Sequence, residues 1–110
     1  MAFKCRGKTV MKSADAVSGV ATVEATLYSS AVRMTVVPTS ASGTGTVTVK
    51  TAGTTDHSPG YEPAYESDGT TALTVDLSAQ KSLDLPGPLV GIKVTSDNSA
   101  DTFGLVAGPT

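Results

Sequence analysis

The sequence predicts an all-β protein, a single-domain antiparallel β-sandwich that is jelly-roll-like and has about eight short strands. Seventeen of the 110 residues are threonine, and many alternate with valine or leucine, as in Thr46–Lys50 and Thr71–Leu77. A period of two places one set of side chains on each face of a pleated strand, where β-branched residues pack well. Clusters of Gly, Pro, Ser, Asn and Asp interrupt this pattern about every 8–12 residues, as in sandwiches, jelly rolls and small barrels.

Four strands are expected in the first half of the chain, at about residues 8–12, 20–28, 31–37 and 45–51. Asp15, Ser18 and Gly19 indicate a turn after the first strand, and a single helical turn is compatible with Ala14–Val17. Pro38 is expected to end the third strand, because proline lacks the backbone donor that a ladder needs. Gly43–Thr46 is expected to be a hairpin turn.

Residues 52–69 are the longest stretch without alternation, and we expect them to form a long loop. Strands are expected again at about residues 70–78, 81–85, 89–95 and 102–107, with a turn at Asp97–Ser99. The side chains expected to face the core in these strands are Leu73, Val75, Leu77, Leu83, Leu85, Val90, Ile92, Val94, Phe103 and Leu105; in the first half they are Val23, Ala25, Leu27, Val32, Met34 and Val36.

Charge is distributed unevenly along the chain. Residues 1–55 carry six basic and two acidic residues, whereas residues 56–110 carry two basic and eight acidic residues. Half of the basic residues, Lys4, Arg6, Lys8 and Lys12, lie in the first twelve positions. We expect residues 1–7 to form a basic N-terminal arm on a single domain of residues 1–110. Such an arm suits a negatively charged partner surface, the alternative being a solvated terminus that tolerates charge.

Several functional classes are disfavoured by composition. No apolar stretch reaches the 18 or so residues of a membrane span, and no apolar segment follows the N-terminal charges as in a secretory signal. Cys5 is the one cysteine, which excludes a disulfide within the chain and fits a reducing cytosol. The acidic second half argues against direct nucleic-acid binding. Gly43–Thr46 lacks the third glycine of a dinucleotide site, and no cofactor is expected.

Residue types that support catalysis are sparse. His57 is the one imidazole, and Asp56, His57 and Ser58 are consecutive, so they cannot adopt the geometry of a catalytic triad. Cys5 lies between Lys4 and Arg6, whose charges favour a thiolate, but it has no evident oriented base. We therefore interpret His57 as a turn residue and Cys5 as an incidental thiol. No enzyme activity is expected.

Two groups of oxygen ligands remain. Glu62, Glu66 and Asp68 surround Tyr61 and Tyr65, and paired carboxylates beside aromatic residues can serve glycoside hydrolysis. The preferred interpretation is a solvated loop whose tyrosines make contacts, because tyrosine is enriched at interfaces. Asp97, Asn98, Ser99 and Asp101 offer oxygens to calcium, but the same residues favour Asx turns. No metal site is expected.

The runs Lys81–Ser96 and Thr46–Lys50 resemble small β-sandwich virion proteins of tailed bacteriophages, including the jelly-roll cement or decoration proteins of capsids. The resemblance implies a non-enzymatic structural protein that binds between capsomers, stabilises the phage head and forms a dimer or trimer. Its partner would be the major capsid protein or another virion protein, on a capsid surface assembled in the host cytoplasm. The candidate contact residues are Lys4, Arg6, Lys8, Lys12, Tyr61 and Tyr65.

Two other functions remain open from the sequence. One is a carbohydrate- or receptor-binding β-sandwich module of a phage tail or head fibre, which would use Tyr61 and Tyr65. The other is an enzyme that uses His57 or the acidic loop, which we rank below the first two hypotheses.

Overall fold

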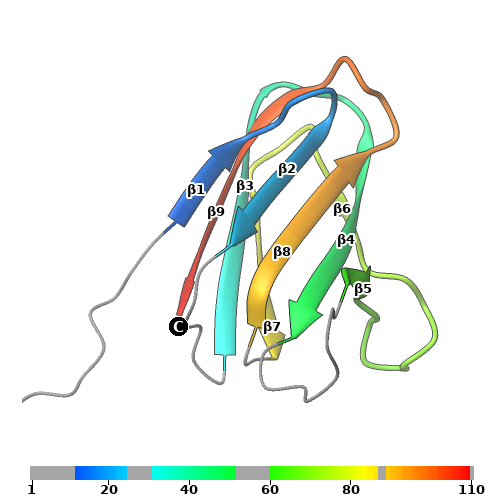
Figure 1. The fold of residues 1–110 in the computed structure, drawn as a ribbon. Helices are drawn as coiled ribbons and strands as arrows, with labels where there is room; N and C mark the ends of the chain where they lie inside the picture. The colour runs from blue at the N-terminus through cyan, green and yellow to red at the C-terminus, as the bar shows by residue number, and fades with distance from the viewer. Residues whose placement is uncertain (1–11, 25–30, 52–59, 87–88, 110) are drawn as a thin grey trace, which may run out of the picture.

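The computed structural model describes residues 12–24, 31–51, 60–86 and 89–109, which form nine strands and no helix. Most of these strands follow the threonine–valine alternation, so that buried and exposed residues alternate along them. Figure 1 labels the strands on the ribbon. The strands are β1 (Lys12–Asp15), β2 (Val20–Glu24), β3 (Ala31–Ser40), β4 (Thr44–Thr51), β5 (Glu62–Pro63), β6 (Thr74–Asp76), β7 (Lys81–Pro86), β8 (Leu89–Ser96) and β9 (Thr102–Pro109).

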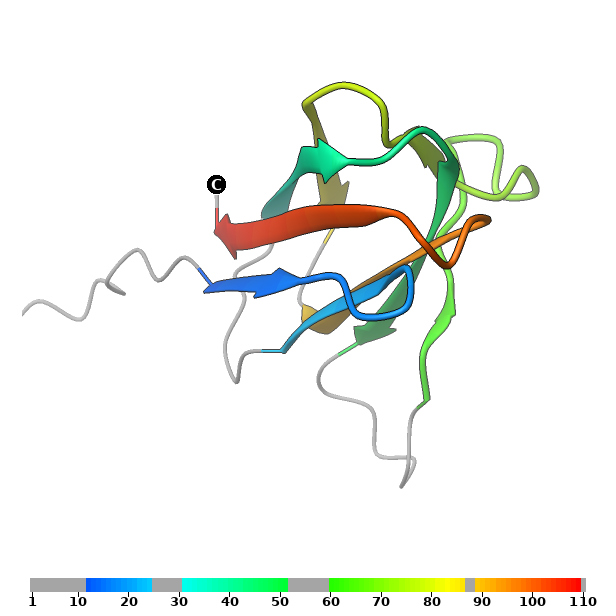
Figure 2. The ribbon, with the colours of Figure 1, turned by 90° about the horizontal axis from the view of Figure 1, so that it is seen from above.

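The strands form two antiparallel sheets that pack face to face (Figure 2). Sheet A has the order β1-β9-β3-β7, and sheet B has the order β2-β8-β4-β5, with β6 also paired to β4. β6 lies opposite Thr44–Thr46 and β5 opposite Thr48–Val49, so the two share one strand position. The first half of the chain therefore pairs with the second half in reverse order. This rolled-up antiparallel ribbon is a jelly roll, which confirms the predicted fold class.

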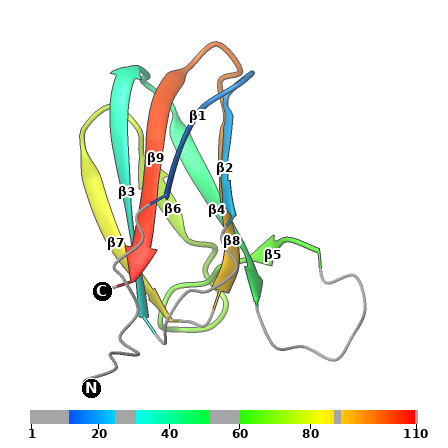
Figure 3. The ribbon, with the colours of Figure 1, turned by 60° about the vertical axis from the view of Figure 1, so that its left-hand side comes forward.

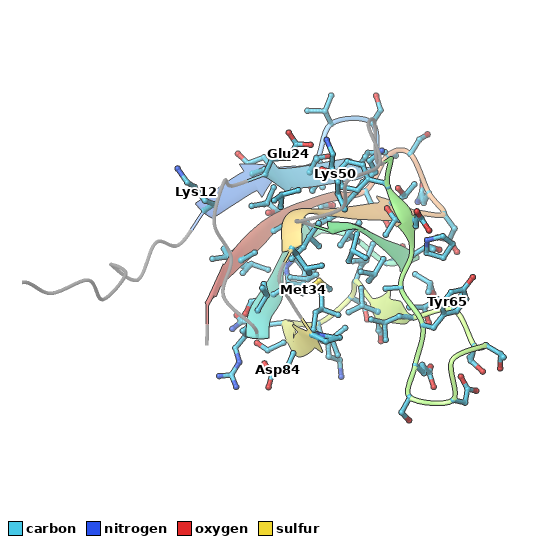
Figure 4. The ribbon with its side chains drawn as sticks, turned by 60° about the horizontal axis from the view of Figure 1, so that its bottom comes forward. Lys12, Glu24, Met34, Lys50, Tyr65 and Asp84 are labelled. Carbon is cyan, nitrogen blue, oxygen red and sulfur yellow. The ribbon has the colours of Figure 1, made fainter. Side chains whose placement is uncertain are left out.

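The core between the sheets contains the residues that the alternation predicts. Met34 points into this space, whereas Asp84 lies on the outer side of sheet A (Figure 4). Buried residues expected from the sequence are Val23, Val32, Met34, Val36, Val75, Leu77, Leu85, Ile92, Val94, Phe103 and Leu105, and Leu73 and Leu83 pack partly buried against them. Ala25 and Leu27 lie outside the described residues.

The expectation for Val90 is only partly met. Val90 is half-buried, and its neighbour Leu89 is buried instead. The pairing register shifts here, because Lys50 lies opposite Gly91 while Thr51 lies opposite Leu89. Residue 90 is thus left without a partner on β4, and the bulge moves Leu89 to the core side.

The expectation that Pro38 ends its strand is wrong, because β3 continues to Ser40. β7 pairs with β3 only as far as Val36, opposite Lys81, whereas β9 continues to pair with β3 beyond that point. Past Val36, β3 is effectively an edge strand, and an edge tolerates a residue without an N–H group. A register shift between Pro38 and Ser40 accompanies the proline.

The turn predicted with Asp15, Ser18 and Gly19 is confirmed at Ser18 and Gly19, but Asp15 belongs to β1. The helical turn expected at Ala14–Val17 is wrong. Val17 and Val20 exchange backbone hydrogen bonds of 2.9 and 3.1 Å around the turn. Ser18 and Gly19 both have positive φ, 54° and 79°, which defines a type I′ hairpin turn. This tight turn carries the chain from β1 in sheet A to β2 in sheet B.

Two other expectations need correction. Gly43–Thr46 is not a hairpin turn, because Thr44–Thr46 already belong to β4, and residues 41–43 cross from β3 in sheet A to β4 in sheet B. The predicted loop at residues 52–69 is not continuous either, since it contains β5 and a bridge between Tyr65 and Ala72. The strand expected at residues 70–78 shortens to Thr74–Asp76. Residues 1–7 and 52–59 lie outside the described residues.

Candidate functional site

Those predicted contact residues that the structure describes do not gather at one place. Lys4, Arg6 and Lys8 lie outside the described residues. Lys12 is the exposed first residue of β1, an edge strand of sheet A, and it lies on the opposite side of the molecule from Tyr65 (Figure 4). Tyr61 and Tyr65 flank β5 at the edge of sheet B. A joint contact surface of Lys12 with the tyrosines is therefore not formed within one copy.

Tyr61 lies on the outer face of sheet B, beside Glu24, Lys50, Gly91 and Lys93. We call these five residues the Tyr61 cluster. Glu24, Gly91 and Lys50 are cross-strand neighbours on β2, β8 and β4. The ring rests against Gly91, and its hydroxyl donates to Glu24 Oε2 at 2.5 Å. Lys93 Nζ lies 4.5 Å and Lys50 Nζ 5.8 Å from the ring centroid, within the range of cation–π attraction. These contacts anchor the chain before β5 to the sheet.

Tyr65 occupies a different environment, a hairpin of residues 64–73 that projects from the edge of sheet B (Figure 1). The strand β5, from which this hairpin continues, lies on the sheet B side of the molecule (Figure 3). We call this segment the projecting hairpin. Ala64 N donates to Val47 O and Leu73 O accepts from Val47 N, both at 3.1 Å, so both arms of the hairpin are tied to β4. Tyr65 remains 51% exposed. Of the two tyrosines, Tyr65 is the one whose side chain is more available to a partner.

Asp68 holds the tip of the projecting hairpin. Its carboxylate accepts hydrogen bonds from Thr70 N at 2.9 Å, from Thr71 N at 2.8 Å and from the Thr71 hydroxyl. The Thr71 hydroxyl, followed by the two backbone N–H groups, lowers the pKa of Asp68 to about 2. This carboxyl group is therefore ionised and engaged in a turn at neutral pH, which is opposite to what a general acid for glycoside hydrolysis requires.

Asp101 is the centre of a polar network at the end of the sandwich that carries the turns after β1, β3 and β8. Only 4% exposed, its carboxylate accepts hydrogen bonds from Ser42 N at 3.2 Å, Gly43 N at 2.9 Å and Ser96 Oγ at 2.8 Å. The Ser96 hydroxyl, and then the two N–H groups, lower the pKa of Asp101. Asp97 Oδ1 accepts from Thr44 N at 3.1 Å. The network fastens the β8–β9 turn to the crossing between β3 and β4.

These bonds account for the oxygens that the sequence offers to calcium. Asp97 and Asp101 accept backbone N–H groups, and the side-chain oxygen of Asn98 accepts from Ala100 N at 3.0 Å. Within the described ranges, no three His, Cys, Asp or Glu residues come together as a metal site would need. The same turns, with Pro38–Ser42 and Ser78, line an open polar depression of about 470 Å³.

His57 and Cys5 lie outside the described residues, so their predicted roles stay predictions. Sequence reasoning missed the Tyr61–Glu24 contact and the Asp101 network. A usable signal existed for the first, because a glycine in the middle of a strand indicates close approach of another group, and Gly91 lies in such a place. No helix in the part of the chain that the structure describes is suited to crossing a bilayer.

No protein-family model and no curated protein sequence matches the chain. A search of solved structures finds similarity to a chain from a structure titled "Bacillus endospore appendages form a novel family of disulfide-linked pili". The two share 10% sequence identity with a TM-score of 0.46, over 98% of this chain and 95% of the other.

Proposed function

We propose that this protein is a non-enzymatic structural protein that binds between subunits of a larger particle, and that the particle is a phage head. The observation that carries the non-enzymatic part of the proposal is the direction in which the pKa values of its carboxyl groups are shifted. In the described ranges, a shifted carboxyl pKa occurs at Asp68, Asp76, Asp84 and Asp101, and each one is lowered. A general acid or base that operates near neutral pH needs a raised carboxyl pKa.

Hydrogen-bond donors from the chain itself lower these pKa values. Ser78 N donates to Asp76 at 2.9 Å, and Arg33 Nε donates to Asp84 at 2.8 Å. The carboxylates therefore stabilise turns and strand pairs within the protein. This supports a protein that acts through surface contacts and not through catalysis. The phage head as the particle rests on the resemblance of Lys81–Ser96 and Thr46–Lys50 to capsid cement proteins.

The proposal is tested on purified virions of a phage that encodes the chain. We expect quantitative mass spectrometry to find it at a copy number comparable with that of the capsomers. We also expect recombinant protein, added to particles that lack it, to bind saturably and to raise the temperature at which the particles release DNA. A few copies per particle would favour the tail or a fibre, and absence from the particles would contradict the proposal.

The basic N-terminal residues are proposed to contribute to this binding. A variant that starts at Lys12 keeps the β1 pairing, because Lys12 lies opposite Ala107 and is the first described residue of the sheet. We expect it to unfold at the same denaturant concentration as the full chain but to bind particles less tightly. Replacing Lys4, Arg6 and Lys8 with glutamine is the matched control for charge. Equal particle binding by all three proteins would exclude a role for the N-terminal charges.

A second candidate, glycan or receptor binding, is favoured by one observation, the exposure of Tyr65 on the projecting hairpin. Tyr61 is less suited to such a role, because its ring contacts Gly91 and lies close to Lys93. If the second candidate is correct, Tyr65→Ala should abolish binding in a glycan array, whereas Val17→Ala, a change at another exposed apolar residue, should not. No binding by the parent protein would end this hypothesis.

A further inference from the structure

The outer face of sheet A has an uncharged centre. The cross-strand register places Val106 beside Thr35, Thr35 beside Ser82, and Gly104 beside Val37. Val37 is 40% exposed, and the hydroxyl groups of Thr35 and Ser82 share a hydrogen bond of 2.9 Å. We call these five residues the sheet A face. It is a surface of small side chains with one apolar projection, at Val37.

Nothing among the described residues requires position 104 to be glycine. A Cβ there would lie 3.7 Å from Asp15 Oδ1 and 3.9 Å from Val37 O, which is ordinary contact. Gly45 is different, because its Cβ would lie 2.6 Å from Val94 Cγ1 in the core, and Gly19 has a positive φ of 79°. Glycine within a strand is destabilising, and where it persists it often indicates close approach of another backbone or a ligand. No group of the described residues makes such an approach at Gly104, which leaves room there for a group from outside them.

The charges around the sheet A face are compatible with a second copy. Arg33 and Asp84 form a two-pronged ion pair, Nε to Oδ1 at 2.8 Å and Nη2 to Oδ2 at 3.3 Å, so this corner of the face is neutral. Asp15, on the edge strand β1, lies opposite Gly104 and brings one carboxylate to the rim of the face. In a pair that exchanges the positions of the edge strands β1 and β7, the two Asp15 carboxylates lie at opposite edges and not against each other. A face with a neutral centre can lie against itself without repulsion between like charges.

The geometry points to a pair of copies that pack these faces together about a two-fold axis parallel to the strands. Gly104 and Val37 lie directly opposite each other on the central strands β9 and β3. Such an axis exchanges the two strand positions, so Val37 of each copy lies over Gly104 of the other. One projection and one recess side by side thus make the surface self-complementary, as an isologous interface requires.

The size of the face determines how strong this pairing is. Four strands about 4.8 Å apart, each contributing about 20 Å of length, cover roughly 300–400 Å². A stable interface buries about 800 Å² on each partner. The pairing is therefore weak between free copies and needs a high local concentration. In this respect the inference rests on the proposed function, because a particle surface supplies that concentration.

Gly104→Ala should weaken the pairing of two copies without destabilising the fold of each copy. Since the added methyl group fits within one copy, the variant should unfold at the same or a higher denaturant concentration than the parent. The methyl group would occupy the recess for Val37, so the dissociation constant of the pair should rise about tenfold or more in sedimentation equilibrium. An unchanged dissociation constant, or a parent that remains monomeric at the highest concentration reached, would overturn the inference.

A cross-link tests the contact itself. In a Cys5→Ser background, Val37→Cys protein mixed with Gly104→Cys protein should give a disulfide-linked pair upon oxidation. The matched control mixes Val37→Cys with Thr46→Cys, which lies on the outer face of sheet B, and should give little product. Equal yields would overturn the inference, as would a cross-link that forms only after residues 1–11 are removed. A protein that binds particles without forming the Val37–Gly104 link would retain the proposed function and lose the pairing.

Discussion

The Tyr61 ring occupies the space that a side chain at position 91 would need. A Cβ on Gly91 would lie 2.9 Å from Tyr61 Cζ and 3.0 Å from Cε1. The hydroxyl of the same ring donates to Glu24 Oε2 at 2.5 Å, 37 residues away in the sequence. One tyrosine therefore ties the chain before β5 across β8 to β2. The glycine and the tyrosine form one packing unit, and this relationship leads to the first prediction.

Gly91→Ala should lower the free energy of unfolding by about 1 kcal/mol, because the new methyl group displaces a ring held by Glu24. In a Tyr61→Ala background, the same change should be neutral or stabilising, since glycine within a strand costs about 0.5–1 kcal/mol relative to alanine. Urea denaturation of the four proteins in this double-mutant cycle measures the coupling. Additive effects of the two substitutions would show that Tyr61 and Gly91 are not coupled.

Asp101→Ala should destabilise the protein more than Asp97→Ala. Asp101 accepts three hydrogen bonds while almost fully buried, whereas the exposed Asp97 carboxylate accepts one from Thr44 N. Removing a carboxylate at position 101 leaves buried N–H groups without an acceptor, which is the costly case. Thermal unfolding of both variants at neutral pH measures the difference, and equal midpoints would contradict the importance of the network.

The same network predicts the pH dependence of stability. The folded-state pKa of Asp101 is lowered, mainly by the Ser96 hydroxyl, so its contribution is present above the unfolded pKa of about 3.9. This contribution is lost as the pH falls from that value through the lower folded pKa. Unfolding midpoints measured from pH 7 to pH 2 should therefore fall less steeply for Asp101→Asn than for the parent. Parallel curves would indicate that Asp101 does not contribute to acid sensitivity.

Asp68 provides a direct spectroscopic test of the projecting hairpin. Its carboxyl carbon should titrate with a pKa of about 2 in an NMR experiment. Thr71→Val removes the hydroxyl that donates to Asp68 and should raise this pKa toward the ordinary value of about 3.9. Thr74→Val, at an exposed threonine of β6, is the control and should leave the titration unchanged. A parent pKa near 3.9 would mean that the turn does not hold the carboxylate.

Phe103 and Val17 are apolar residues at opposite extremes of burial, with exposed fractions of 1% and 74%. Phe103→Ala should cost about 3–5 kcal/mol because it removes a large side chain from the core between the sheets and leaves a cavity. Val17→Ala should change the free energy of unfolding by no more than about 0.5 kcal/mol, as at most exposed positions. Guanidinium denaturation resolves the two effects. A small loss at Phe103 would be inconsistent with its packing.

The sequence by itself determined the class of the fold and most of the apolar side chains that are buried. Alternation is a local property of a strand, so Val32, Met34 and Leu105 are assigned to the core without knowledge of any pairing. The turn at Ser18 and Gly19 is equally local, because the positive φ angles depend on the residues that adopt them. The resemblance to virion proteins adds an expectation about the partner that the fold does not test.

Only the tertiary structure decided which strands are neighbours and what the polar residues between them do. Pro38 is tolerated because β7 ends opposite Val36, and Asp101 is buried because Ser42 and Gly43 reach it from 59 and 58 residues away. Tyr61, a candidate contact residue from the sequence, packs against Gly91 on another strand. These outcomes depend on contacts between distant segments, whose register is set by the packing of two complete sheets. Local alternation carries no information about that register.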